Sequence, residues 1–123
     1  MGDERWIVDG MNVIGSRPDG WWRDRPGAMR SLARELGAWA AGREVAVIFD
    51  GAPFDLQADG VDVRFASRRG RNAADDDIAR MVEEDGRPEE LRVVTSDHEL
   101  ARRVREFGAE VVGAGEFRRM LGT

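Results

Sequence analysis

Aspartates stand at or just beyond the ends of several short hydrophobic runs in this sequence. Asp9 ends the run WIVD, Asp50 ends the run VAVIFD, and Asp97 comes two residues after the run LRVVT. Three further acids, at 75–77, begin an amphipathic stretch. Carboxylate oxygens are the ligands that hard cations such as Mg²⁺ and Mn²⁺ prefer, and an ion held by them can promote phosphodiester hydrolysis. These residue types therefore favour metal-dependent phosphoryl chemistry.

The acids can meet only if the elements that carry them run in parallel. Short β-branched runs alternate with amphipathic stretches, which predicts one α/β domain over 1–123. We expect three layers, with helices on both faces of a mostly parallel sheet of about five strands. The predicted strand 61–66 alternates apolar and polar residues, which is typical of an edge strand, and its short connection leaves its direction open. The expected strands are 5–9, 44–49, 61–66, 91–95 and 109–112, and the expected helices are 26–41, 73–84, 97–107 and 116–121.

A parallel sheet brings the acids at its strand ends to one edge. Ligands gather at the carboxyl ends of strands in open α/β sheets, so the strand-end acids and the 75–77 run should face one cleft. Each acid also has a structural explanation. Asp9 and Asp50 precede glycines that favour turns, and Ser96 begins an S-x-x-E capping box. Together, however, the acids repel one another, which raises their pKa values and favours a bound cation.

Composition excludes several classes of function. The chain has 24 acidic residues and 19 arginines, with no lysine, for a net charge of −5. It has no cysteine, which excludes disulfides, cysteine zinc sites and thiol nucleophiles. The lack of lysine argues against haloacid dehalogenase-type phosphatases and receiver domains, and no phosphate-binding glycine loop follows the first strand. No signal peptide or membrane-spanning run is recognisable, so we expect a cytoplasmic protein with no membrane partner.

Four short motifs resemble those of the NYN domain, a branch of the PIN-like nucleases. They are Asp-Gly-x-Asn at 9–12, Phe-Asp-Gly at 49–51, Ala-Asp-Asp-x-Ile at 74–78 and Thr-Ser-Asp at 95–97, in this order along the chain. The sequence is most similar to the bacterial YacP-like group, over 6–121. The resemblance implies a PIN-like α/β/α sandwich and an endoribonuclease that uses one or two Mg²⁺ or Mn²⁺ ions.

The resemblance also assigns the site residues. It makes Asp75 a metal ligand and Asp76 a secondary candidate. Helical geometry favours the same order, because Asp75 flanks the apolar stripe of its helix and Asp76 points away from it. The implied catalytic set is Asp9, Asn12, Asp50, Asp75 and Asp97, in which the aspartates bind metal and the asparagine organises the pocket.

Arginines and tryptophans near the acids indicate how RNA could be held. Arginine offers a planar fork to phosphate, and a tryptophan face can stack an unpaired base. We expect single-stranded RNA as the partner, and the resemblance adds the ribosome as a platform. Either Trp21 or Trp22 could instead pack its loop onto the first long helix. The candidate RNA-binding residues are Arg17, Trp22, Arg23, Arg25, Arg68, Arg69, Arg71 and Ser96.

Other functions are also compatible with this sequence. A non-catalytic RNA-binding or ribosome-associated module could keep the same fold and acids. A nuclease acting on structured DNA and a hydrolase of small phosphoesters would use the same metal chemistry. His98, beside Asp97, could act as a general acid, but we favour an exposed position at a helix start. We expect Arg102, Arg103 and Arg105 to form a solvated helix face.

Overall fold

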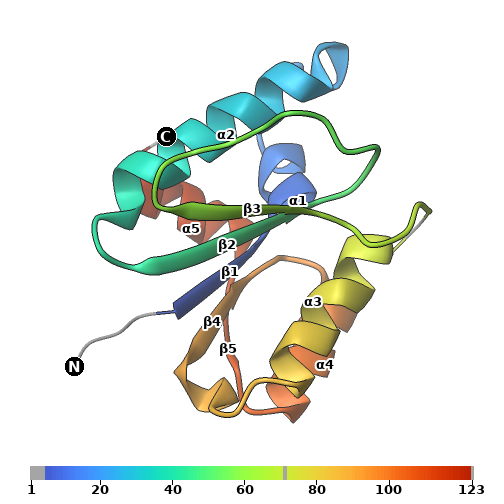
Figure 1. Ribbon diagram of the computed structural model, residues 1–123, viewed down its shortest axis with the longest axis vertical. Helices are drawn as coiled ribbons and strands as arrows, with labels where there is room; N and C mark the ends of the chain where they lie inside the picture. The colour runs from blue at the N-terminus through green and yellow to red at the C-terminus, as the bar shows by residue number, and fades with distance from the viewer. Residues whose placement is uncertain (1–4, 71, 123) are drawn as a thin grey trace.

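In the computed structural model, residues 5–70 and 72–122 are described, and they form a five-stranded sheet between two layers of helices (Figure 1). The strand order is β3-β2-β1-β4-β5, and every neighbouring pair is parallel. The predicted α/β sandwich is therefore confirmed. The strands are β1 (Arg5–Asp9), β2 (Glu44–Phe49), β3 (Val61–Phe65), β4 (Leu91–Val94) and β5 (Glu110–Val112).

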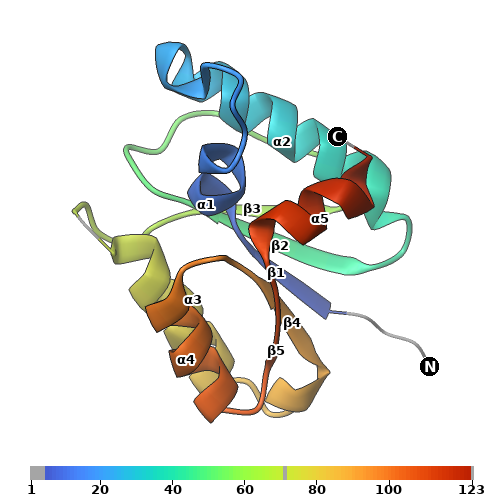
Figure 2. The same cartoon turned by 180° about the vertical axis from the view of Figure 1, so that it is seen from behind.

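Helices α1, α2 and α5 cover one face of the sheet, and α3 and α4 cover the other (Figures 1 and 2). Successive side chains of a strand point to opposite faces, so Trp6 and Val8 of β1 pack under α2 and α5 while Ile7 packs under α3 and α4. In the described part of the chain, no helix is long and apolar enough to cross a bilayer. The helices are α1 (Gly10–Gly15), α2 (Arg25–Ala40), α3 (Ala73–Glu83), α4 (His98–Glu106) and α5 (Ala114–Leu121), with 3-10 turns at Trp21–Arg23 and Pro88–Glu90.

Strand β3 lies at the sheet edge, as its alternating sequence predicts, and it runs parallel to β2. The parallel direction requires the chain to return along the sheet before β3 begins. Segment 50–60 makes this return on the α2 side, where Phe54 and Leu56 pack against the buried core. Its apolar side chains replace the crossover helix that usually joins parallel strands.

Helix α1 follows β1 directly and is absent from the elements expected from the sequence. Gly10 was expected to provide a turn, but it instead begins this helix. A methyl group at Gly10 would lie 2.5 Å from the ring of Phe49 and 3.1 Å from the carbonyl oxygen of Ile48. Glycine is therefore needed here for close packing against the end of β2. At Gly51, by contrast, φ is +103°, the left-handed backbone that favours glycine.

Replacing Gly10 with alanine should lower the free energy of unfolding by about 1–3 kcal/mol, because the new methyl group overlaps the buried Phe49 ring. The matched control is Gly115→Ala, which adds the same methyl group in open space on α5 and should be neutral or slightly stabilising. Urea unfolding followed by tryptophan fluorescence measures both. Equal effects of the two substitutions would contradict the close approach at Gly10.

Candidate functional site

Carboxylates reach the carboxyl edge of the sheet from four segments of the chain. Asp9 is the last residue of β1, and Asp50 directly follows β2. Asp97 precedes α4, just after β4, and Asp75 lies in the first turn of α3. Because β1 pairs in parallel with both β2 and β4, these strand ends lie side by side. The side chains that the sequence predicts to converge therefore approach the same edge.

Asp9 is the most buried of these acids, with only 4% of its surface exposed. Thr95 at the end of β4 donates a hydrogen bond from Oγ1 to Asp9 Oδ2 at 3.0 Å, and the backbone N–H of Asn12 also stabilises the carboxylate. Burial, followed by the negative charge of Asp75 and to a smaller extent that of Asp50, raises the pKa of Asp9 to about 7. The hydrogen bonds oppose this rise without cancelling it. The sequence does not predict that Thr95 binds Asp9, because this contact depends on the register of β4 against β1.

Asn12 connects α1 to the loop that carries Asp97. Its Oδ1 accepts a hydrogen bond from the backbone N–H of Ser96 at 2.7 Å. The hydroxyl of Ser96 in turn accepts the N–H of Ala114, the first residue of α5, at 2.8 Å. The backbone N–H of Asp97 donates to Thr95 Oγ1 at 3.1 Å. The asparagine thus fixes the position of the loop that carries Asp97. The Ser96 hydroxyl, which was predicted to bind RNA, binds the start of α5.

Asp50 and Asp97 each use one carboxylate oxygen to satisfy the start of a helix. Asp97 Oδ1 accepts the N–H of Leu100 at 2.8 Å and so caps α4, where the sequence had suggested Ser96 as the cap. Asp50 Oδ1 accepts the N–H of Ala74 in the first turn of α3 at 3.1 Å. Each contact leaves the second carboxylate oxygen without a hydrogen bond from the described residues. Both acids therefore have a structural role as well as a candidate functional one.

Asp75 is half-buried and accepts no hydrogen bond from any described residue. Burial raises its pKa, and the negative charges of Asp97 and Asp50 raise it further, while Arg103 opposes the rise. Asp75 therefore interacts electrostatically with Asp9, Asp50 and Asp97. These interactions identify a region of excess negative charge shared by all of these acids.

The two acids that follow Asp75 are engaged differently. Asp76 Oδ1 accepts a hydrogen bond from Arg103 at 2.9 Å, and its Oδ2 pairs with Arg68, so Arg103 and Arg68 lower its pKa. Asp77 accepts the N–H and hydroxyl of Ser67, which hold the loop before α3. Arg103 was expected on a solvated helix face, but it reaches across to α3. No sequence signal marks this contact, because it depends on how α4 packs against α3.

The donor set fits a hard cation, although the described side chains do not form a closed metal shell. Within residues 5–70 and 72–122, no three His, Asp or Glu side chains lie close enough together to hold an ion. The acids nevertheless offer oxygen ligands alone, and burial together with the negative charge of neighbouring acids raises the pKa values of Asp9 and Asp75. A divalent cation would relieve this repulsion and draw the carboxylates inward.

The loop between α1 and α2 carries an exposed aromatic face. The Trp22 side chain is 59% exposed, and the guanidinium of Arg23 lies 5.9 Å from the centre of its ring. Trp21 packs against the core, which the sequence had left as an alternative for either tryptophan, and Arg25 lies 5.7 Å from its ring. This loop and the 67–70 turn project beyond the same edge of the sheet (Figures 1 and 2).

The other predicted RNA-binding arginines have varied surroundings. Arg17 forms a two-fold ion pair with Glu35, with a shortest distance of 2.7 Å, and only 12% of its side chain is exposed. This pairing makes Arg17 a structural residue that joins the end of α1 to α2. Arg68 pairs with Asp76, Arg69 is exposed, and Arg71 lies outside the described residues.

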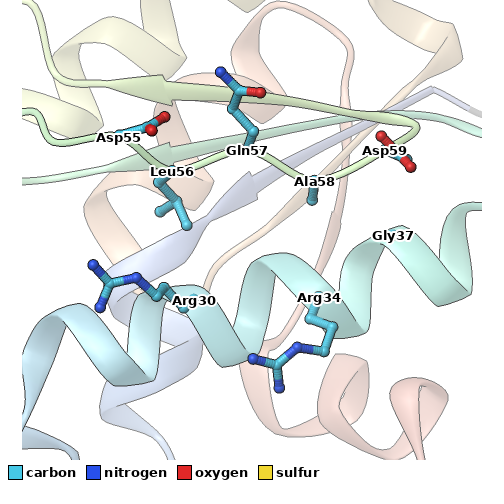
Figure 3. A pocket seen from close by; sticks show the side chains of 8 residues that line it. All are labelled: Arg30, Arg34, Gly37, Asp55, Leu56, Gln57, Ala58 and Asp59. Atoms are coloured by element: carbon cyan, nitrogen blue, oxygen red, sulfur yellow. The ribbon is translucent and has the colours of Figure 1, made fainter.

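A groove of about 430 Å³ lies between α2 and the returning segment 50–60 (Figure 3). Arg30 and Arg34 lie on its helical wall, with Leu56 on the opposite wall. None of the site residues predicted from the sequence lines this groove. The acids at the carboxyl edge of the strands therefore form a separate feature.

Comparison with known proteins finds both a family and a fold. The profile of the YacP-like NYN domain matches residues 6–123. A crystal structure of a tryptophan-to-leucine mutant of Rae1 (YacP) from Bacillus subtilis is similar, with a TM-score of 0.82 and 23% identity over 97% of this chain and 75% of that one. A second Rae1 (YacP) structure from Bacillus subtilis gives a TM-score of 0.80 and 23% identity over 97% and 74% of the two chains. No curated protein matches the chain.

Replacing Asp9 with asparagine should stabilise the protein above neutral pH in the presence of a chelator. A carboxyl whose pKa rises from 3.8 to about 7 on folding keeps its proton while the unfolded chain loses one, so stability falls as the pH rises through this window. The full loss is on the order of 4 kcal/mol above pH 7. Asparagine carries no charge and escapes this loss.

Urea unfolding at pH 4, 6 and 8 measures the difference between Asp9→Asn and the unsubstituted protein. The expected advantage of the variant grows with pH. Asp62→Asn makes the same charge change at an exposed ion pair with Arg64 and controls for net charge. A variant that is less stable than the parent at pH 8 would show that the hydrogen bond from Thr95 outweighs the repulsion.

Proposed function

This chain belongs to the YacP-like NYN domain family, and we propose that it is a metal-dependent endoribonuclease that hydrolyses RNA phosphodiester bonds. The family is nuclease-like, and membership in it suggests an RNase-like fold. One observation carries the proposal: carboxylates from four segments reach the same edge of the sheet, where burial and then the negative charge of neighbouring acids raise the pKa of Asp9 to about 7. Repulsion between these acids does not stabilise the fold, and a cation bound between them would relieve it, which supports the proposal.

The residues proposed to hold Mg²⁺ or Mn²⁺ are the four aspartates of this edge. When bound, such an ion neutralises phosphate charge and activates water for attack on phosphorus. Asp76 is excluded from this set in our proposal, because arginines engage both of its oxygens. The proposed ligands are Asp9, Asp50, Asp75 and Asp97.

The chain's own residues position these ligands. Thr95 holds Asp9 through Oδ2, so the orientation of the buried carboxylate is set by the neighbouring strand. Asn12 holds the backbone of Ser96 and so limits movement of the loop that carries Asp97. With a pKa of about 7, Asp9 can hold or release a proton near neutral pH. A bound cation would displace this proton, because a carboxylate binds metal in its deprotonated form.

The exposed Trp22 face, with Arg23 beside it, is the proposed binding surface for single-stranded RNA. An unpaired base can stack on Trp22, and the guanidinium of Arg23 is near enough to contact the adjoining phosphate. Arg25, over the ring of Trp21, adds positive charge to the same loop. Attachment to the ribosome and a cytoplasmic location remain predictions from the sequence.

A non-catalytic RNA-binding module is the second candidate. Two observations favour it: Asp50 and Asp97 each accept a backbone N–H at the start of a helix, and no three described acidic or histidine side chains form a metal group. Such a module would bind RNA equally well in Mn²⁺ and in chelator and would release no product.

Replacing Asp75 with asparagine should reduce the RNA cleavage rate by at least about 100-fold. This aspartate is the sharpest choice, because it accepts no hydrogen bond from the described residues and its loss breaks no helix cap. Cleavage of an end-labelled single-stranded RNA in Mn²⁺ measures the effect, with chelator as the zero point and DNA of the same sequence alongside. Asp62→Asn should cleave at the parental rate. Equal rates for the Asp75 and Asp62 variants would refute the proposed metal site.

Replacing Trp22 with alanine should weaken the binding of single-stranded RNA by about 5- to 100-fold, because base stacking on the ring is lost. Fluorescence anisotropy in chelator measures binding without cleavage, and Trp22→Phe should restore part of the affinity. Phe107→Ala is the matched control, because Phe107 is also exposed, at 38%, and follows α4 at the opposite edge of the sheet. Unchanged affinity in the Trp22→Ala variant would remove the stacking surface from the proposal.

A further inference from the structure

Asp76 is shared between two arginines that come from different elements. Arg68 lies in the turn before α3, and Arg103 lies on α4. Arg103 donates from one terminal nitrogen to Asp76 Oδ1 at 2.9 Å, and Arg68 donates to Asp76 Oδ2. One carboxylate therefore bridges two guanidinium groups and holds them close together.

This bridge is open to solvent. The side chains of Arg68, Arg103 and Asp76 are 52%, 33% and 35% exposed. Ion pairs at such exposure contribute little stability, so another anion can replace the carboxylate at low cost. The ion pair of Arg17 with Glu35 differs, because the Arg17 side chain is 12% exposed and its partner is 28% exposed.

The bridge also borders the acidic site. Asp76 follows Asp75 directly on α3, and the positive charge of Arg103 lowers the pKa of Asp75 against the effect of its acidic neighbours. Positive charge therefore stands next to the carboxylates proposed to hold metal. An RNA strand whose scissile phosphate reaches these carboxylates brings a neighbouring phosphate to the same rim.

We propose that Arg68 and Arg103 form a binding site for an RNA backbone phosphate, and that Asp76 is an internal counter-ion which this phosphate displaces. This inference rests on the proposed function and adds a binding site and a role for Asp76. A phosphodiester presents two non-bridging oxygens and one negative charge, as the carboxylate does, so it can receive the same two guanidinium groups. In the free protein Asp76 keeps the two arginines from repelling each other.

The test is a thermodynamic cycle of RNA binding measured by fluorescence anisotropy in chelator. Asp76→Asn should tighten the binding of a labelled single-stranded RNA by about 3- to 10-fold, since the phosphate no longer competes with a carboxylate. The gain should vanish in the Arg68→Gln/Arg103→Gln background. Asp62→Asn, with the same charge change at a remote exposed ion pair, should leave the affinity unchanged. Circular dichroism checks that each variant is folded.

Three results, two of them in this cycle, would overturn the proposal while leaving the proposed function intact. The first is parental RNA affinity in Asp76→Asn, with RNA still cleaved in Mn²⁺ by the unsubstituted protein. The second is a gain in affinity that persists without the two arginines, which would make Asp76 a source of general repulsion. Loss of Mn²⁺ binding in Asp76→Asn would also overturn it, because Asp76 would then be a metal ligand.

A titration with pyrophosphate separates the inference from the proposed function. The Nε–Hε NMR signals of Arg68 and Arg103 should shift on adding pyrophosphate, at lower concentrations in Asp76→Asn than in the parent. If no variant binds RNA, the proposed function fails, and these signals still decide whether the two arginines form an anion site that Asp76 occupies. Signals that do not move in either protein would refute the site.

Discussion

The negative charge of Asp9 is the constraint on which the carboxyl edge of the sheet depends. This carboxylate is 4% exposed, and burial of a charge is costly unless hydrogen bonds or an opposite charge compensate it. Thr95 donates a hydrogen bond, but the nearby charges of Asp75 and Asp50 add repulsion, and no arginine among the described residues forms an ion pair with Asp9. The other end of β1 shows the contrast, since Arg5 there pairs with an aspartate of the chain. The charge at the start of β1 is therefore paired within the protein, whereas Asp9 at its end has no oppositely charged partner among the described residues.

Two of the acids that surround Asp9 are stabilised by hydrogen bonds from the backbone. Asp50 and Asp97 accept N–H groups at the starts of α3 and α4, where the helix dipole favours negative charge. Hydrogen bonds from backbone N–H groups therefore hold the Asp50 and Asp97 carboxylates in position. Asp75, which has no such hydrogen bond within the described residues, is the acid best able to adjust when a ligand arrives. The edge thus combines carboxylates that accept backbone N–H groups with one, Asp75, that accepts no hydrogen bond from the described residues.

Much of this edge could be predicted because strand ends and their acids follow from hydrophobic runs of the right length. The preference for Asp75 over Asp76, which the family resemblance implies and helical geometry supports, stays a prediction. Helix α1 could not be predicted, because Gly10 and Asn12 are weak helix formers and no polar linker separates them from β1. The pairing of Arg103 with Asp76 and of Arg17 with Glu35 depends on how whole helices pack, which local sequence does not encode. The direction of β3 depended on apolar contacts of segment 50–60 that only the tertiary structure reveals.

The proposed binding of RNA poses a problem of charge placement for an acidic protein. With a net charge of −5, it cannot attract a polyanion through its overall field, so attraction must come from local groups. Many of its arginines are already neutralised by carboxylates, as Arg17, Arg64 and Arg102 illustrate. Positive charge is then available to RNA where an arginine has no such partner, or where phosphate displaces the carboxylate from its arginine.

Displacement requires little free energy only where the ion pair is exposed. Beside the acidic edge, the bridge through Asp76 meets that condition. Exchange of one anion for another is therefore a form of recognition that this charge distribution allows, in addition to contact with local positive charge.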